Sequence, residues 1–433
     1  MHDDEGRDEA VIRIIMSEVE PPPGRMGAAD LLAAGRRARR RRRSTAATAG
    51  AFVLSLLAVG GVQLLDRDGP ADPPALLGPA AMTSTTPPPP CTATPLELGP
   101  KATEGSVNAG SPSGRYLVGF TSFKGTIGSA VRWDGTKQQR LPVPGVLADP
   151  LAVNDSGLVV GRYQTGARTV AWAWTGSGDL IHLPIPAGYT GAEANAVNAA
   201  GDVAGVLFGR KGTVPVVWRG VNAKAWPEEV KAPGKALAFG ISDAGVVVGT
   251  VEGEKGSVPY QWDAAGVGSP LALPDGTSAA TVLGVRGDWA YGLLFPKPTD
   301  GADPSAVEQR KQAAALAQEK LQPYGPEATR GPGTAAGFPN PAATRQLGIA
   351  AVWDLRNGTA AVVTEGRIGV VNSRRWLVVN RPEGLAELRA PDNTSRELPG
   401  LRGKPDSYAA ALSEDGGWIG GSSAGVPVRW NCP

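Results

Sequence analysis

A segment that recurs every 41 to 44 residues constrains the fold of this chain more than any other feature of its sequence. The segment reads roughly Ala-Val-Asn-x-x-Gly-x-Val-Val-Gly, and an Ala-Val-x-Trp stretch and a short Leu-Pro stretch follow it. Clear copies begin at Ala152, Ala196 and Gly240. The glycines that close successive copies are separated by 42, 44, 44 and 43 residues and are Gly119, Gly161, Gly205, Gly249 and Gly292. This regular spacing predicts a repeat architecture, in which each period is one supersecondary unit.

Each period contains four short runs of Val, Ala, Leu and Trp bounded by Gly, Asn, Asp and Pro, which is typical of four antiparallel strands. Four strands in about 40 to 45 residues is the length of one propeller blade. The fifth copy is interrupted before Trp353, the sixth is degraded and ends near Leu398, and the last ends at Trp430. The count is seven, so we predict an all-β fold, a seven-bladed β-propeller. With 59 Gly and 39 Pro, the chain is too rich in helix breakers for an all-helical fold.

A tryptophan stands at the same place in most of the copies. In isolation such a residue could stack on a sugar, but at a fixed place in successive blades we expect it to pack between them. These blade-packing residues are Trp133, Trp174, Trp218, Trp262, Trp353 and Trp430. Four others lie outside the repeated position and are better candidates for the surface: Trp172, Trp289, Trp376 and Trp418.

The Asn-Asp-x-Gly part of each unit predicts a tight turn between the first and second strands, because Asn and Asp bond their own backbone and Gly accepts a positive φ. Acidic residues recur in these turns at Asp155, Asp243 and Asp415, which raises calcium binding as an alternative. Calcium needs six or more oxygen ligands, whereas each turn offers one carboxylate. Because the chain has only two Cys and two His, we expect no metal site and no cofactor.

The two ends of the repeat region predict how the ring closes. The last copy lacks the Leu-Pro strand that ends most others, and Leu96–Pro100 precedes the first copy as an unpaired strand of that type. We expect this strand to complete the last blade. Cys91 lies just before it and Cys432 just after the final strand, so we predict a disulfide between them. A disulfide requires an oxidising compartment.

The units resemble the HAF family of probable extracellular repeats over about 340 residues. The resemblance lies in the apolar-Asn-x-x-Gly-x-Val-x-Gly stretch and the following Ala-x-x-Trp stretch, which the second, third and fourth copies match well. The fifth copy lacks the Asn and reads Gly284-Val285-Arg286-Gly287, and the sixth lacks the Trp. The resemblance implies an extracytoplasmic, propeller-like domain without a defined activity.

Residues 44–65 carry no charged side chain and, as a helix, would span roughly 33 Å, the thickness of a bilayer core. We predict a transmembrane helix that is an uncleaved signal anchor; a buried helix or a cleaved signal peptide is the alternative. A topogenic basic cluster directly precedes it: Arg36, Arg37, Arg39, Arg40, Arg41, Arg42 and Arg43. The cluster predicts a single-pass plasma-membrane protein with a cytoplasmic N-terminus and the propeller outside. Similar clusters bind nucleic acid, but beside an apolar span they act on topology and anionic lipid, so we expect no nucleic-acid partner.

The remaining N-terminal segments are a cytoplasmic leader, residues 1–43, and a Pro-rich extracytoplasmic linker, residues 66–90. The leader has a helix-like apolar period from Ala10 to Val19 but is too short for a robust core, so it is either a partner-binding peptide or a solvated leader. Leader and anchor loosely resemble membrane proteins of actinobacteria, including anti-sigma factors. The zinc motif of those regulators is incomplete, because no Cys precedes Cys91.

The fifth copy is interrupted by an insertion at about 296–346 that matches no repeat. Its centre, residues 305–322, has a weak apolar stripe typical of a helix. An insertion in a blade maps to a loop on one face, often the binding face, although a tolerated excursion explains it equally well.

No His-Glu-x-x-His or phosphate-loop motif occurs, and we assign no catalytic residue. We expect residues 91–433 to be a non-catalytic binding, scaffold or sensor module for an extracytoplasmic protein or a cell-wall glycan. One alternative is an enzyme acting on cell-wall polysaccharide, in which carboxylates would converge at the central channel. Another is an anti-sigma-like regulator acting through a cytoplasmic partner of residues 1–43. The near balance of charge outside the membrane argues against a polyanion partner.

Overall fold

The computed structural model describes residues 89–433 except 124–127, 145, 223, 255, 298–348, 364–365, 382–383 and 402–405. The expected leader, anchor, nearly all of the linker and the insertion helix therefore lie outside the described residues. Within these ranges, no helix is both long enough and apolar enough to cross a membrane. The repeat region belongs to one compact unit, residues 84–433.

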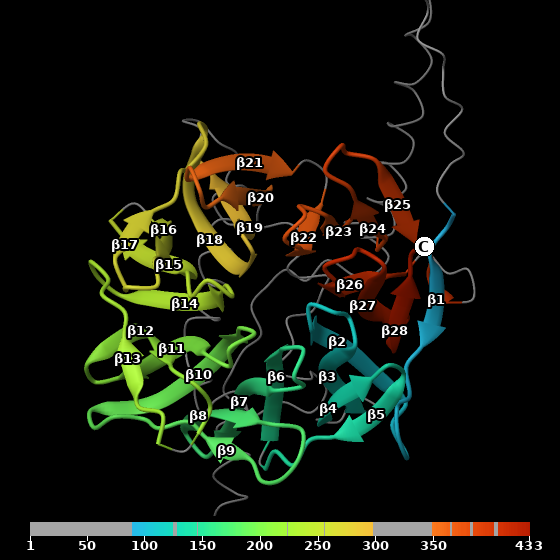
Figure 1. Ribbon diagram of the computed structural model, residues 1–433, viewed down its shortest axis with the longest axis horizontal. Coiled ribbons are helices and arrows are strands. Elements are labelled where there is room, and N and C mark those ends of the chain that lie inside the picture. The colour runs from blue at the N-terminus through green and yellow to red at the C-terminus, as the bar shows by residue number, and fades with distance from the viewer. Residues whose placement is uncertain are drawn as a thin grey trace, which may run out of the picture. The chain divides into compact units, whose positions relative to one another are not determined.

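Seven four-stranded antiparallel sheets form this unit (Figure 1). Blades 1 to 3 consist of β2 (Glu104–Gly110), β3 (Tyr116–Ser122), β4 (Ser129–Asp134) and β5 (Lys137–Arg140); β6 (Val146–Val153), β7 (Val159–Thr165), β8 (Arg168–Trp174) and β9 (Ile181–His182); and β10 (Tyr189–Val197), β11 (Val203–Gly209), β12 (Gly212–Trp218) and β13 (Pro227–Glu229). Blades 4 and 5 consist of β14 (Ala236–Ile241), β15 (Val247–Gly253), β16 (Gly256–Trp262) and β17 (Gly268–Pro270); and β18 (Thr277–Arg286), β19 (Trp289–Pro296), β20 (Ile349–Asp354) and β21 (Thr359–Val363). Blade 6 consists of β22 (Arg367–Val371), β23 (Leu377–Asn380), β24 (Ala386–Arg389) and β25 (Ser395–Leu398), and blade 7 of β26 (Tyr408–Leu412), β27 (Trp418–Ser423), β28 (Val426–Asn431) and β1 (Thr92–Pro95).

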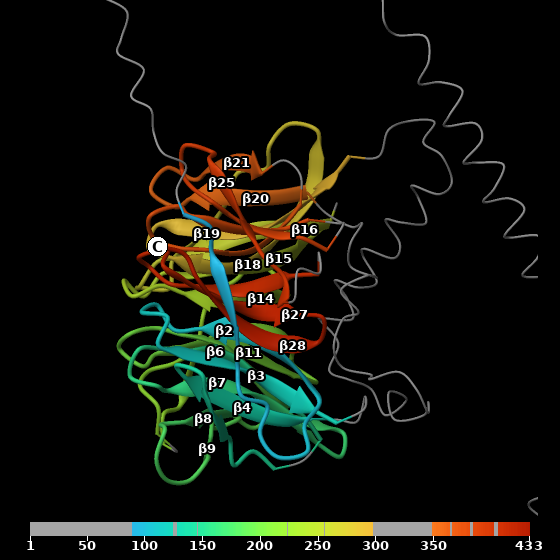
Figure 2. The same ribbon diagram turned by 90° about the vertical axis from the view of Figure 1, so that its right-hand side faces the viewer.

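The first strand of each blade lies closest to the axis of the ring. Strand β2 contacts β6, β6 contacts β10, and the series continues through β14, β18, β22 and β26, which returns to β2. Figures 1 and 2 show the short fourth strands at the rim and the stacked sheets from the side. The predicted seven-bladed propeller is confirmed.

The regularly spaced glycine of the second strand lies where the backbone of the first strand bulges towards it. A register shift occurs between Pro150 and Ala152 in β6, and Gly161 in β7 pairs with Pro150. A Cβ atom on Gly161 would lie 2.0 Å from the main-chain oxygen of Asp149, and one on Gly249 would lie 1.8 Å from that of Leu237. The spacing that defines the repeat in the sequence is therefore the spacing of these bulges.

The closing strand differs from its predicted position. Strand β1 pairs antiparallel with β28, from Thr92 opposite Asn431 to Pro95 opposite Val428, so the ring closes as expected but one segment earlier than Leu96–Pro100. The reason is the role of the Leu-Pro stretch. A leucine at the end of the short fourth strand, or directly after it, is buried in the core: Leu96, Leu141, Leu183, Leu271 and Leu398. Three of these, Leu141, Leu183 and Leu398, belong to a Leu-Pro pair.

Candidate binding surface

Five of the expected blade-packing tryptophans share one hydrogen bond. Each of them donates its indole N–H to a main-chain oxygen of the preceding blade, just beyond that blade's fourth strand, and each is fully buried. The bonds are Trp133 to Glu97 (2.7 Å), Trp218 to Pro184 (3.2 Å), Trp262 to Lys231 (2.7 Å), Trp353 to Ala272 (2.8 Å) and Trp430 to Pro399 (2.8 Å). Because both ring faces are enclosed, these tryptophans are not accessible to a ligand.

Blade 2 departs from this pattern. Trp174 is buried but donates locally, to the main-chain oxygen of Gly178 at 3.3 Å. Trp172, which we expected to be a surface candidate, is completely buried, and its indole nitrogen has no hydrogen-bond partner among the described residues. A Cβ on Gly161 would lie 2.8 Å from the Trp172 ring, and one on Gly205 equally close to Trp218. Trp172 thus fills in blade 2 the space that the repeated tryptophan fills in blade 3.

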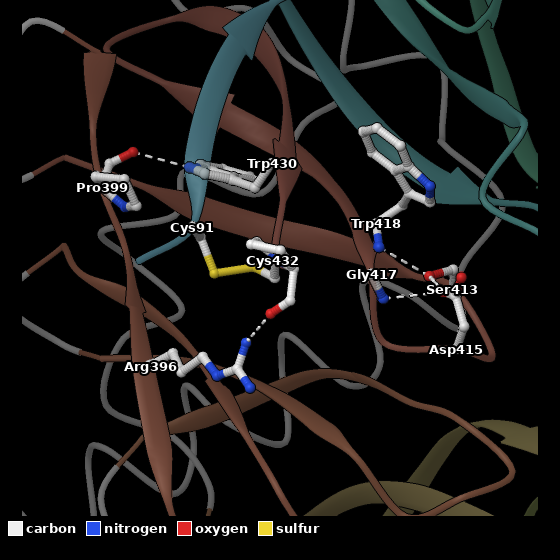
Figure 3. Close-up of a disulfide and its surroundings, with 10 residues drawn as sticks. Cys91, Arg396, Pro399, Ser413, Asp415, Gly417, Trp418, Trp430 and Cys432 are labelled. Atoms are coloured by element: carbon white, nitrogen blue, oxygen red, sulfur yellow. Dashed lines mark hydrogen bonds between the residues drawn. A yellow bond between two sulfur atoms is a disulfide. The ribbon is translucent and has the colours of Figure 1, made fainter. Parts of the chain in front are cut away.

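A disulfide joins Cys91 and Cys432, whose Cα atoms are 4.3 Å apart, at the junction of β1 and β28 (Figure 3). Both residues are buried within a cluster that includes Trp430. The main-chain N–H of Cys432 also donates to Gly417, and Arg396 donates to the main-chain oxygen of Pro433 at 2.7 Å. Covalent and hydrogen bonds therefore hold the closing strands together.

The antiparallel order of the strands gives the ring two distinct faces. Connections from first to second strand and from third to fourth strand lie on one face, which we call the turn face. Connections from second to third strand and between blades lie on the opposite face. The insertion joins β19 to β20, a second and a third strand, so it leaves the ring on the face opposite to the turn face.

Hydrogen bonds between neighbouring turns run along the turn face. The carboxylate of Asp155 accepts from the main-chain N–H of Ser113 in the blade before, and Asp243 accepts from Ala199 in the same way, both at 2.8 Å. In blades 6 and 7 the equivalent acid is Glu414, which accepts from Ser373 at 2.8 Å.

The recurring acids therefore bind main-chain N–H groups rather than gathering around a cation. Asp415 accepts from Ser413 and Gly417 of its own turn, which holds the pKa of its carboxyl below the ordinary value (Figure 3). In the described parts of the chain, no three His, Cys, Asp or Glu side chains are grouped so that they could hold a metal ion.

Buried and partly buried aromatic rings on the turn face carry arginine side chains. Three of the four expected surface tryptophans, Trp289, Trp376 and Trp418, belong to this set. The pairs, with the distance from the guanidinium carbon to the ring centroid, are Arg115 with Tyr116 (4.7 Å), Arg132 with Tyr116 (4.7 Å) and with Trp174 (4.7 Å), Arg356 with Trp289 (5.5 Å), Arg375 with Trp289 (5.2 Å), Arg396 with Trp376 (5.9 Å) and Arg429 with Trp418 (3.8 Å). We call these residues the arginine–aromatic arc; it extends over blades 5, 6, 7, 1 and 2.

Most arginines of the arc are held by other groups as well. Arg115 forms an ion pair with Asp134 at 3.0 Å and keeps the pKa of that carboxyl low, and Arg356 pairs with Asp354 at 2.6 Å. Arg132 donates to the main-chain oxygen of Gly157 at 3.0 Å and to Gln139 at 2.8 Å. These bonds fix the rings and guanidinium groups in place.

The arginines of the arc were not identified from the sequence, although a signal existed for two of them. Arg132 and Arg429 each directly precede a repeated tryptophan. Because side chains alternate along a strand, this position faces away from the tryptophan. The same position carries the buried apolar residues Ala173, Val217 and Val352 in three other blades, and Gln261 in blade 4. An arginine at a position that is mostly apolar is the anomaly that marks this surface.

Trp226 was also missed. It lies on the turn face, in the connection between β12 and β13, and is 63% exposed. It is outside both the repeat pattern and the arc.

Two carboxylates meet nearer the axis of the ring, in blades 2 and 3. Arg162 lies between Asp149 at 3.3 Å and Glu193 at 2.6 Å. Burial raises the pKa of the Asp149 carboxyl, against the attraction of Arg162. Arg286 of blade 5 also donates to the main-chain oxygen of Gly110 in blade 1, at 3.0 Å, and so bridges the ring. The carboxylate pair is thus compensated by an arginine and sits in a structural network.

No protein-family model and no curated protein matches this sequence. The solved structures similar to it include virginiamycin B lyase from Staphylococcus aureus, with 11% sequence identity, coverage of 79% of this chain and 98% of the lyase, and a TM-score of 0.45. A structure described as YCF48 bound to D1 peptide has 12% identity, coverage of 80% of this chain and 96% of that chain, and a TM-score of 0.43. At these values the similarity concerns the fold alone.

Proposed function

We propose that this chain is a membrane-anchored, extracytoplasmic propeller that binds a protein partner, without catalysis, through its turn face. The arginine–aromatic arc is the observation that carries the proposal. Aromatic rings and arginines are enriched at the energetic centres of protein interfaces. Here both residue types are preorganised, because hydrogen bonds and ring contacts already fix the side chains that a partner would meet.

Between the two ligand classes expected from the sequence, the arc favours a protein over a glycan. A sugar needs an uncovered ring face on which to stack. The ring of Trp418 carries the guanidinium of Arg429, and Gly114 of blade 1 packs against the base of the same ring. Trp289 carries two guanidinium groups. These rings present arginine side chains rather than their own faces to a ligand.

The cell-surface location in this proposal comes from the apolar segment at residues 44–65, the preceding arginines and the resemblance to extracellular HAF repeats. The disulfide between Cys91 and Cys432 suits an oxidising exterior.

Site-specific photo-crosslinking tests the proposal. A benzophenone amino acid at Arg374, an exposed turn-face residue beside the arc, should crosslink an envelope protein when the full-length chain is expressed in cells. The matched control is the same substitution at Arg168, which is exposed on the opposite face. Crosslinks from position 168 alone, or from neither position, would contradict binding through the turn face.

A further inference from the structure

The guanidinium group of Arg429, on the Trp418 ring, makes no hydrogen bond or ion pair with any described residue. Its Nε atom is inaccessible to solvent and has no partner. Two arginines of blade 1 that stack on neighbouring rings are paired, Arg115 with Asp134 and Arg132 with the main-chain oxygen of Gly157, although the Nε of Arg132 is also buried without a partner among the described residues. A guanidinium group has five N–H donors, and a buried donor without an acceptor is costly. An unpartnered group of this kind in a native fold calls for an explanation.

The residues around Arg429 come from both sides of the contact between blades 7 and 1 at the turn face. Gly110, Ser111 and Gly114 of blade 1 line one side, and Ser413 and Trp418 of blade 7 line the other. The guanidinium lies 3.8 Å from the centroid of the Trp418 ring. Trp418 is itself held, because its main-chain N–H donates to the Ser413 hydroxyl at 2.9 Å (Figure 3). The Trp418 ring therefore holds the plane of the Arg429 guanidinium in a fixed position at the turn face.

We propose that Arg429 binds a carboxylate of an acidic peptide segment in the protein partner, while Trp418 holds the guanidinium group in place. The assignment rests on the proposed protein-binding function of the turn face and names its central subsite. A carboxylate matches the planar fork of a guanidinium and can accept two parallel N–H bonds.

The charges around Arg429 favour a peptide over a dense polyanion. Asp134 and Asp415 interact electrostatically with Arg429, although neither forms an ion pair with it. Burial outweighs their attraction and lowers the pKa of the Arg429 guanidinium. Two fixed carboxylates near one guanidinium repel a polymer with a charge on every unit, but they admit a single carboxylate flanked by neutral or basic groups. An acidic side chain in a peptide of mixed composition meets that condition.

The experiment uses the full-length chain in detergent micelles and an array of synthetic peptides, each made with Asp and Glu and again with Asn and Gln. Peptides retained by the wild type are then titrated by fluorescence anisotropy. We expect the amide forms to bind about ten- to a hundredfold more weakly, and Arg429→Met to weaken the carboxylate forms by the same factor. Met keeps the length and the packing over Trp418, so the melting temperature should not fall. The control, Arg168→Met, should bind like the wild type.

Arg429→Lys keeps the charge and provides a second test if the Met variant folds poorly. It should also bind more weakly, because Lys cannot form the bidentate pair. Equal binding by wild type and both variants, or by the carboxylate and amide peptides, would overturn the Arg429 subsite and leave the turn face as the proposed binding surface. Failure of every peptide, together with no crosslink from position 374, would instead remove the proposed function. Arg429-dependent binding to phosphatidylglycerol vesicles without peptide binding would replace the peptide by a lipid surface.

Discussion

Trp430 donates its indole N–H to the main-chain oxygen of Pro399 at 2.8 Å, and this bond ties the last blade to the blade before it. The same bond recurs at four other tryptophans, so the repeated indole nitrogen has as clear a role as the ring. The bond explains why the position holds Trp rather than another large apolar residue: Phe and Leu could fill the space but could not donate.

Replacing Trp430 with Phe should lower the free energy of unfolding by about 2 kcal/mol, because the oxygen of Pro399 loses its donor and the smaller ring leaves a gap. Urea denaturation followed by circular dichroism measures the change. Trp226→Phe is the matched control, since Trp226 is 63% exposed and its replacement should cost less than about 0.5 kcal/mol. Equal losses in the two variants would show that the indole bond contributes nothing.

The fold could be predicted because the residues that define it recur with a fixed period along the sequence. The arginine–aromatic arc could not be predicted, because its residues do not recur in this way. Every blade except the degraded blade 6 has a buried tryptophan and a glycine at the bulge, so the sequence repeats these residues. The arginine–aromatic arc uses Tyr116, Trp289, Trp376 and Trp418 with arginines that come from turns, third strands and a fourth strand. Only the ring geometry brings these positions to one face.

Local ambiguity accounts for the other differences. Trp172 and Trp174 are two residues apart and therefore point to the same side of β8, so alternation cannot decide which of them packs against Gly161. The Leu-Pro stretch was expected to be a strand because it is short and apolar, yet its leucine is buried as an anchor at the end of the strand. Periodicity locates such residues without distinguishing these roles.

Substitution of Gly161 by Ala tests the role of the repeated glycine. The added Cβ would lie 2.0 Å from the main-chain oxygen of Asp149, so β6 and β7 must move apart, and we expect a loss of more than about 2 kcal/mol of stability. Gly234→Ala is the control, because the nearest atom to its added Cβ lies at 3.7 Å and its φ is not positive. Urea denaturation of both variants gives the comparison, and a Gly161 variant as stable as the Gly234 variant would contradict the assignment.

The phenol of Tyr189 should titrate well above the ordinary range. Burial and the hydrogen bond that its hydroxyl donates to Glu229, at 2.8 Å, raise its pKa to about 12. The folded chain therefore keeps this proton at a pH at which the unfolded chain, with an ordinary pKa near 10, has lost it. This contribution to stability is present below pH 10 and is lost as the pH rises from about 10 to 12.

Ultraviolet titration of the phenolate absorbance, with Tyr189→Phe as the difference, measures that shift. Glu229→Gln should move the titration of Tyr189 back towards 10, because the acceptor loses its charge. A difference titration centred near 10 in the otherwise unchanged chain would contradict the contact.

The bond between Cys91 and Cys432 spans 341 residues and joins the two strands that complete blade 7, so its loss should open the ring at one seam. Cross-linking so long a loop restricts the unfolded chain, and the chain-entropy relation gives roughly 4 to 5 kcal/mol of stabilisation. We expect Cys91→Ala with Cys432→Ala to lower the urea midpoint strongly, and each single replacement to lower it as much as the pair, because either one removes the whole bond. Proteolysis should then begin near Thr92 in the variants, since β1 is held to β28 by backbone hydrogen bonds alone.

The control is the wild-type chain with dithiothreitol, which should match the double variant. A midpoint that is unchanged in the double variant would show that the backbone pairing of β1 and β28 closes the ring without help from the disulfide.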